Sequence, residues 1–480
     1  DNNVAVGQSA LLVNTTGTEN TAIGENALAT NTTGRENDAS GRKALFANTT
    51  GSYNSASGAT ALATNTTGAN NTAHGYRALY LNTTASNNTA VGYQSLYANT
   101  TGDRNVAMGG LALDANTTAD GNTAFGYDSL STNTGSELNV AIGFNALRLY
   151  NNGSGSGYNT AVGALAGAAV TTGINNTLIG GLAGDAITTA NDNVAVGKGS
   201  LTADTTGAEN TAVGNVTLAF NTTGASNAAF GYGALYANTT ASNNTAIGYL
   251  SLAANTTGHS NVSVGKSSMV ANTTGLENVA MGMVSLDANT TGDYNTALGH
   301  AALSTLTTAD NNTAVGHKAL YLNTTGDRNV AVGALALDAN TTADGNTALG
   351  YSVLSANTTA ELNTGVGFQA LRLNTTGANN TAVGSSALGA NTTGAGNTAV
   401  GYQAGDAITT GANNTLIGYD TSATAVDSTN VIAIGNAVAG ETNYTTLGNG
   451  GADIRASHGV ATWATVSDER YKKDIVDSTA

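Results

Sequence analysis

A glycine recurs every 17 residues along most of this chain, and that period constrains the fold more than any other feature. The series begins with Gly7, Gly24 and Gly41, resumes at Gly163 after one step of 20 residues, and continues to Gly435, which makes 26 glycines in register. A fixed period of this length is typical of repeat proteins, in which each unit contacts mainly its neighbours. The 480 residues therefore predict one long array in place of several globular domains.

Each unit combines two turn-forming clusters with two short apolar stretches. Asn stands four positions before the glycine in 25 of the 26 units, Ala two positions before it in 22, and Leu four positions after it in 20. Asn-Thr-Thr-Gly fills the opposite corner, as in residues 14–17 and 31–34. Helices tolerate Gly and Asn poorly, and the apolar stretches have the length of strands. Two short strands and two turns in 17 residues predict one coil of an all-β parallel solenoid, or β-roll, of about 26 coils.

The expected coil has a thin core. Successive coils would lie about 4.8 Å apart, so the array predicts a rod of roughly 120 Å. One Val or Ile and one Leu per coil, with Ala elsewhere, bury little apolar surface against the entropy of ordering the backbone. We expect that pair to stack between coils, and the Ala stripe (Ala5, Ala22, Ala39, Ala56, Ala73 and onward) to pack on other chains. This interpretation favours a homo-oligomer, and we expect a homotrimeric fibre.

Composition excludes several classes of function. The chain has no Cys, so disulfides and thiolate metal sites are impossible. A net charge of −16 argues against a nucleic-acid partner, which needs clustered Lys and Arg. No apolar run approaches the length of a membrane span, so we expect no membrane insertion. No signal peptide is visible, and because Asp1 enters within a repeat we expect the natural chain to begin earlier.

Irregularities divide the array. Residues 151–158 (NNGSGSGY) carry the three extra residues, so we expect solenoid repeats over 1–150 and 159–440, an insertion loop at 151–158, and a junction at 441–466. Gly replaces the usual Leu at Gly167, Gly184 and Gly405. Residues 102–127 and 326–351 are nearly identical, which indicates a longer duplication beneath the short repeat.

Two segments of the repeat carry a resemblance to a known family. NTAVGYQSL (88–96) and NVAIGFNAL (139–147) resemble the repeats in the head domains of trimeric autotransporter adhesins, and the pattern covers residues 1–440. The resemblance implies a left-handed parallel β-roll that assembles as a trimer on a cell surface. The unit is longer here than the usual head repeat, with the extra length in the Asn-Thr-Thr-Gly corner.

The C-terminal sequence SDERYKKDI (467–475) resembles the opening of the intramolecular chaperone domain that ends many phage tail spikes and endosialidases. The resemblance implies that residues 467–480 begin such a domain, which guides trimer assembly and then releases itself. By the same resemblance, Ser467 would be the nucleophile and Lys472 its base, with cleavage at Ser467 in a longer chain. The alternative is a charged, solvated tail.

The Asn-X-Thr sequences are formal N-glycosylation acceptors. Two interpretations remain open: an internal ladder of stacked Asn side chains, or a sugar coat along one edge of the solenoid. Further acceptors occur at Asn70, Asn87 and Asn243. The corner candidates are Asn14, Asn31, Asn48, Asn65, Asn82, Asn99, Asn116, Asn238, Asn255 and Asn272.

Other side chains repeat in register without a clear site. His300 and His317 should stack about 5 Å apart, but two ligands make a weak metal site, so we predict no metal and no cofactor. The stacked Thr residues suggest ice binding, which we disfavour because adjacent Thr side chains in a strand face opposite sides. Aromatic residues recur one position after the glycine, where they would stack or form a carbohydrate-binding stripe: Tyr76, Tyr93, Tyr127, Phe144, Tyr232, Tyr249, Tyr351, Phe368 and Tyr402.

These patterns favour a structural role. We expect an extracellular fibre, such as a phage tail fibre or a cell-surface filament or adhesin shaft, whose main partners are other copies of the chain. The alternative is an adhesin head that binds cell-surface glycans, and an ice-binding solenoid is less favoured. We expect no enzymatic activity except autoproteolysis at Ser467 in a longer chain.

Overall fold

The computed structural model describes residues 2–451, 453–459 and 463–465. These residues form an all-β parallel solenoid of about 26 turns and include no helix. The chain divides into two compact units, Asp1–Asn244 and Thr245–Ala480. We refer to them as unit 1 and unit 2.

The strands are short and nearly uniform. Unit 1 contains β1 (Val4–Val6), β2 (Thr21–Ile23), β3 (Asp38–Ser40), β4 (Ser55–Ser57), β5 (Thr72–His74), β6 (Thr89–Val91), β7 (Val106–Met108), β8 (Thr123–Phe125), β9 (Ser136–Glu137), β10 (Val140–Ile142), β11 (Gly155–Ser156), β12 (Thr160–Val162), β13 (Thr177–Ile179), β14 (Val194–Val196), β15 (Thr211–Val213) and β16 (Ala228–Phe230).

Unit 2 continues the same pattern until its C-terminal part. Its strands are β17 (Thr245–Ile247), β18 (Val262–Val264), β19 (Val279–Met281), β20 (Thr296–Leu298), β21 (Thr313–Val315), β22 (Val330–Val332), β23 (Thr347–Leu349), β24 (Thr364–Val366), β25 (Thr381–Val383), β26 (Thr398–Val400), β27 (Thr415–Ile417), β28 (Ser422–Ala423), β29 (Ile432–Gly435), β30 (Ala439–Gly440), β31 (Tyr444–Gly448), β32 (Ile454–Ser457) and β33 (Trp463–Thr465).

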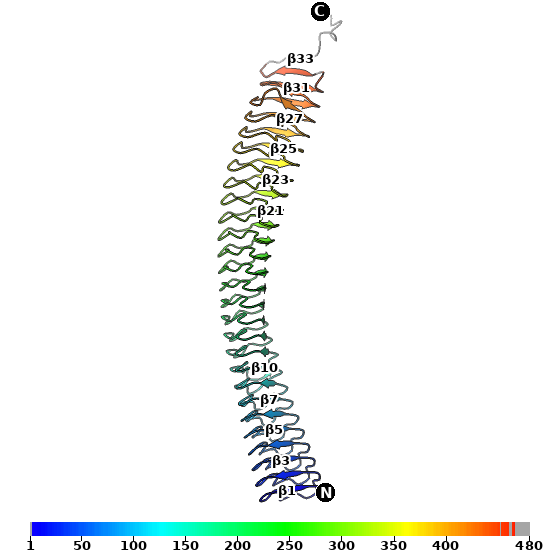
Figure 1. The fold of residues 1–480 in the computed structure, drawn as a ribbon, viewed down its shortest axis with the longest axis vertical. Coiled ribbons are helices and arrows are strands. Elements are labelled where there is room, and N and C mark those ends of the chain that lie inside the picture. Colours follow the sequence, from blue (N-terminus) through cyan, green and yellow to red (C-terminus); the bar gives the residue numbers. More distant parts are fainter. Residues whose placement is uncertain (1, 452, 460–462, 466–480) are drawn as a thin grey trace, which may run out of the picture. The chain divides into compact units, whose positions relative to one another are not determined.

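Within each unit, the strands of successive coils pair in parallel and in register. Ala5 lies opposite Ala22, and Ala22 lies opposite Ala39. Figure 1 shows these strands as a series of side-by-side arrows, one per coil. The 17-residue period is therefore the length of one coil, as the spacing of the glycines predicts.

The expectation of two strands per coil is wrong. A typical coil has one three-residue strand, and the stretch after its glycine is a series of turns with left-handed residues. In the coil that starts at Tyr93, Gln94 has a φ of 52° and Leu96 a φ of 51°. This conformation costs about 1–2 kcal/mol per residue. Inter-coil hydrogen bonds offset that cost, since Leu96 N donates to Ala112 O at 2.9 Å and Ala98 N to Asp114 O at 2.9 Å.

The buried face of the strand is the opposite of the one that the sequence predicts. Ala22 and Leu28 are fully buried, as are the equivalent Ala and Leu of most coils. The apolar residue just before the glycine points outward instead, with Ile23 at 44% and Ile142 at 37% exposure. The Ala stripe therefore lies inside the chain, and the expectation that it packs on other chains is wrong. Most coils have a small side chain at this inward strand position, and the fully buried Leu four positions after the glycine supplies the larger apolar volume.

Two ladders of Asn side chains run through the interior of each unit. In the first, which uses the Asn four positions before the glycine, Asn54 N donates to Asn37 Oδ1 at 3.0 Å and Asn54 Nδ2 to Gly68 O at 2.9 Å. In the second, which uses the Asn of Asn-Thr-Thr-Gly, Asn48 Nδ2 donates to Asn31 Oδ1 at 2.8 Å and to Gly51 O at 2.9 Å. The ladders satisfy buried polar groups at both corners.

The recurring glycine is required for two reasons. Gly109 has a φ of +131°, which side-chain-bearing residues rarely adopt, and a Cβ built on it would lie 2.5 Å from Gly126 O in the next coil. The coils approach each other too closely at this corner for any side chain.

The two irregular segments have distinct structures. In the insertion, β11 pairs in parallel with β9 beside the main sheet. Near the C-terminal end, β29 pairs in parallel with β31, but β31 pairs antiparallel with β32, and β32 antiparallel with β33. The parallel stack thus gives way to antiparallel strands in the segment where the repeat pattern ends.

Candidate functional site

The C-terminal motif lies outside the described residues. Ser467 and Lys472 both fall in the segment 466–480, whose placement is not described. Their assignment as nucleophile and base stays a prediction.

The corner Asn residues are the members of the second ladder. All of the predicted corner acceptors except Asn14 are fully buried, and Asn14 in the first coil is half-buried. A sugar on Nδ2 of Asn48 would displace that nitrogen from Asn31 and Gly51. The geometry therefore favours the ladder interpretation at these positions. Asn70, Asn87 and Asn243 are exposed instead.

The outer face of the strands carries an apolar stripe. We define the strand-face stripe as the residues immediately before and after the recurring glycine. In unit 1 its exposed large apolar members are Val6, Ile23, Tyr76, Tyr93, Phe125, Tyr127, Ile142, Phe144, Ile179, Phe230 and Tyr232. In unit 2 they are Ile247, Tyr249, Met281, Met283, Leu349, Tyr351, Phe368, Val383, Val400, Tyr402, Ile417, Tyr419 and Ile434.

The aromatic members of the stripe stack in pairs. The ring centroids of Tyr127 and Phe144 are 6.0 Å apart at an interplanar angle of 14°, and those of Tyr402 and Tyr419 are 5.2 Å apart at 17°. Stacking along the solenoid is thus confirmed for these pairs. Each partner covers one face of the other ring, so a ligand could reach only the edges and the outer faces.

The two stacked histidines make no wider cluster. The rings of His300 and His317 are 5.4 Å apart at an interplanar angle of 14°, close to the spacing that the sequence predicts. Among the described residues, no group of three or more His, Cys, Asp or Glu side chains could hold a metal ion.

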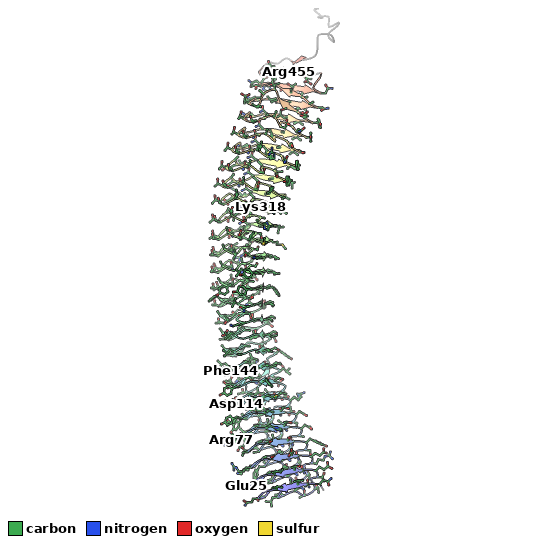
Figure 2. The ribbon with its side chains drawn as sticks, in the orientation of Figure 1. Glu25, Arg77, Asp114, Phe144, Lys318 and Arg455 are labelled. Carbon is green, nitrogen blue, oxygen red and sulfur yellow. The ribbon has the colours of Figure 1, made fainter. Side chains whose placement is uncertain are left out.

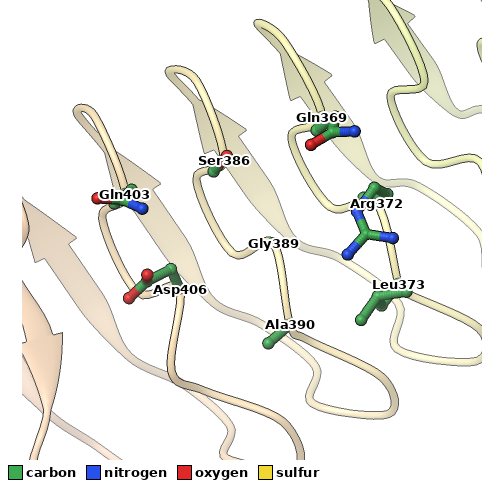
Figure 3. A pocket seen from close by; sticks show the side chains of 8 residues that line it. All are labelled: Gln369, Arg372, Leu373, Ser386, Gly389, Ala390, Gln403 and Asp406. Carbon is green, nitrogen blue, oxygen red and sulfur yellow. The ribbon is translucent and has the colours of Figure 1, made fainter.

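A polar hollow lies on another face of unit 2, where Gly389 leaves a gap between two coils (Figure 3). Arg372 and Asp406 occupy the equivalent positions of the preceding and following coils, and Gln369, Ser386 and Gln403 form a row along one side. The hollow has a volume of about 220 Å³. That is below the usual size of small-molecule sites, roughly 300–1,000 Å³.

The two charged side chains of this hollow lie on opposite sides of Gly389. Arg372 and Asp406 are two coils, or about 10 Å, apart, and among the described residues they form no ion pair with each other. Burial, and then the nearby carboxylate of Asp420, raise the pKa of Asp406. The hollow offers a cation, an acid and two amides to a small polar molecule, but its shallowness argues for weak binding.

A buried acid interrupts the second Asn ladder in unit 1. Asp204 stands where most coils have Asn, is fully buried, and accepts hydrogen bonds at Oδ1 from Gly207 N at 3.0 Å and Asn221 Nδ2 at 3.2 Å. Its Oδ2 has no hydrogen-bond partner. Burial raises the pKa of Asp204 to about 7, although those hydrogen bonds lower it. This acid is a fully buried irregularity of the second ladder.

The motifs considered in the sequence analysis do not identify the two hollows. Both the hollow at Gly389 and a second one at Ala63 arise where a small residue five positions after the glycine stands between two larger ones in adjacent coils. That signal is present in the sequence, but it appears only when residues 17 positions apart are compared.

The fold and surfaces define a parallel β-solenoid repeat protein. Comparisons with models of protein families, with curated proteins and with solved structures gave no match. Among the described residues, no helix is long and apolar enough to cross a membrane.

Proposed function

We propose that the protein is a structural element of an extracellular fibre, and that three copies associate through the strand-face stripe. The observation that carries this proposal is the stripe itself, in which side chains such as Phe125, Phe144 and Tyr402 are 46–52% exposed. Monomeric proteins rarely expose a continuous apolar patch of large size, and such patches usually mark an interaction surface.

A second copy of the same chain is the partner that best matches the stripe. Exposed apolar members of the stripe occur in many coils and are separated by whole coils, so another copy offers apolar side chains at matching spacings. Three copies around one axis form a closed assembly in which every stripe is covered. A partner protein without the 17-residue repeat would not present apolar side chains at the spacing of the coils.

Satisfied polar groups in the interior support the structural role. The two Asn ladders and the inter-coil backbone hydrogen bonds hold the coils of each unit together. The resemblance of residues 467–475 to a chaperone motif supports a fibre whose longer form is processed at Ser467, at a virion or cell surface.

Glycan binding by the stripe is the second candidate. Exposed aromatic rings favour it, because sugars stack on such rings. The pairing of Tyr76 with Tyr93 at 5.8 Å, and of the other pairs, weakens it by covering ring faces.

The test is the mass of the protein in solution, measured by light scattering. We expect three times the chain mass of 47.3 kDa. The variant F125K/I142K/F144K should dissociate to single chains while it keeps the β signal in circular dichroism. The matched control T84K/T101K/T118K adds the same charges at exposed Thr positions and should stay trimeric. A wild-type mass of one chain would overturn the proposal.

A further inference from the structure

A cluster of positive charge surrounds the hollow at Ala63 in unit 1. The chain has only 15 Lys and Arg residues against 31 Asp and Glu, yet Arg42, Lys43 and Arg77 line this one hollow. Its volume is about 480 Å³, within the usual range for small-molecule sites. The remaining lining residues are Phe46, Ala47, Thr60, Ala63, Thr64 and Tyr80.

The hollow is a gap in a file of aromatic rings. Phe46, Ala63, Tyr80 and Tyr97 occupy the same position, five after the glycine, in four consecutive coils. The rings of Tyr80 and Tyr97 stack at 5.5 Å with an interplanar angle of 6°. Ala63 has no ring, so Phe46 and Tyr80 stand two coils, or about 10 Å, apart. One ring-shaped group between them would lie at stacking distance from both.

The cations are held beside these rings. Lys43 Nζ lies 5.8 Å from the centroid of Phe46, and Arg77 Cζ lies 5.5 Å from the centroid of Tyr80. The guanidinium of Arg77 also lies 5.2 Å from the centroid of Tyr76, and Arg77, which Figure 2 labels in unit 1, is half-buried. These cation–π contacts position two positive charges on either side of the gap.

Among the described residues, none of the three cations forms an ion pair. The ion pairs there involve Arg104, Arg328 and Arg455 instead. In addition, Arg77 Nε is buried and has no hydrogen-bond partner. Three cations without an ion pair, one of which carries this unpaired donor, are a feature that an anion would satisfy.

We propose that this hollow binds an acidic sugar unit of a glycan. Its ring would take the place of the missing side chain between Phe46 and Tyr80, and its carboxylate or sulfate would contact Arg42, Lys43 and Arg77. A nucleic acid fits less well, because a long polyanion would meet the acidic surface elsewhere on the chain. The site is formed by three successive coils of one chain. Arg42 follows Gly41 and so belongs to the strand-face stripe, whereas Lys43 and Arg77 lie outside it.

The first experiment titrates the full chain with three lactose derivatives by calorimetry. We expect 3′-sialyllactose, 3′-sulfolactose or both to bind once per chain, and neutral lactose to bind at least about tenfold more weakly, as expected for loss of a charge-assisted contact. Binding of only one acidic sugar would assign the anion as carboxylate or as sulfate. Equal binding of lactose, or no binding of either acidic sugar, would overturn the proposal.

Variants locate the site. Ala63→Tyr fills the gap with the residue already present at positions 80 and 97, so it should abolish binding while thermal unfolding stays unchanged. Ala168→Tyr makes the same change at the same coil position of unit 1, far along the chain, and should bind as wild type. Arg77→Gln should weaken the acidic sugar about tenfold or more and leave the mass of the assembly unchanged. Unaltered binding by Ala63→Tyr would also contradict the assignment.

Discussion

The side chain of Leu178 occupies the space that Gly167 leaves in the adjacent coil. A Cβ built on Gly167 would lie 2.7 Å from Leu178 Cδ1. Leu178 replaces the usual inward Ala, Gly167 replaces the usual Leu, and Val170 replaces the ladder Asn. The same exchange recurs in unit 2, where a Cβ on Gly405 would lie 2.7 Å from Leu416 Cδ1. Apolar volume is therefore conserved in these coils although its position shifts.

Restoring the common residue should destabilise this coil. Gly167→Leu matches most repeats, and the left-handed φ of +59° at Gly167 is one that Leu96 adopts at φ 51°, so backbone strain adds little. Overpacking against Leu178 should lower the free energy of unfolding by about 1–3 kcal/mol in urea denaturation. Adding Leu178→Ala should recover most of that loss. If the double variant lost more free energy of unfolding than the two single variants together, the proposed exchange of volume between positions 167 and 178 would be wrong.

Removal of one ladder amide should loosen several coils. Asn48→Ala leaves Asn31 Oδ1 without its donor and takes the acceptor from Asn65 Nδ2, which lies 2.8 Å from Asn48 Oδ1. We expect a loss of about 1–3 kcal/mol, concentrated in neighbouring coils because each coil contacts mainly those beside it. Hydrogen exchange would show faster exchange of the amides of residues 31–66 than in wild type. Thr50→Ala, at an exposed position of the same corner, is the control and should leave exchange unchanged.

Asp204 should make stability depend on pH. Its pKa is raised to about 7 in the folded chain, against about 4 when unfolded, so the folded state binds the proton more tightly. The free energy of unfolding should therefore fall as pH rises from about 4 to 7. Asp204→Asn should reduce this dependence, although other acids such as Asp114 also have a raised pKa, and should be more stable than wild type at pH 8 by on the order of a few kcal/mol.

The control for this pH profile is Asp38→Asn, which removes one carboxylate from an exposed strand position. Thermal unfolding from pH 4 to 8 would compare the two variants with wild type. If the stability of wild type and of Asp204→Asn changed with pH in parallel, the raised pKa assigned to Asp204 would be wrong.

The acceptor sequences should differ in their accessibility. In the folded protein, a soluble enzyme that glycosylates Asn-X-Thr should modify Asn70 and Asn87, which are exposed, and spare Asn65 and Asn82, which are fully buried. Mass spectrometry of peptides would locate the sugars, and urea-unfolded chain should accept sugar at all four. Modification of Asn65 in the folded chain would show that the second ladder opens readily.

The inward and outward strand positions show where sequence reasoning reached its limit. A signal was available: the residue before the glycine is Ser at Ser40 and Ser57 and His at His74, as a surface position allows, whereas the residue before it is nearly always Ala. Hydrophobicity alone favours the larger Val and Ile for the core, and that preference led to the wrong face. The left-handed Leu residues were also missed, because isolated L-residues avoid that conformation.

The sequence by itself determined the coil length, the parallel register, the corner residues and the absence of helices from the repeat, because a covalent period of 17 residues repeats the same local preferences in every unit. Only the tertiary structure decided which strand face is buried and where the surface has hollows. Both depend on side chains that meet across coils: the inward strand residue is small where a buried Leu follows the glycine by four positions and is Leu where Gly167 or Gly405 replaces that residue. The hollow at Ala63 exists because Phe46 and Tyr80 flank it.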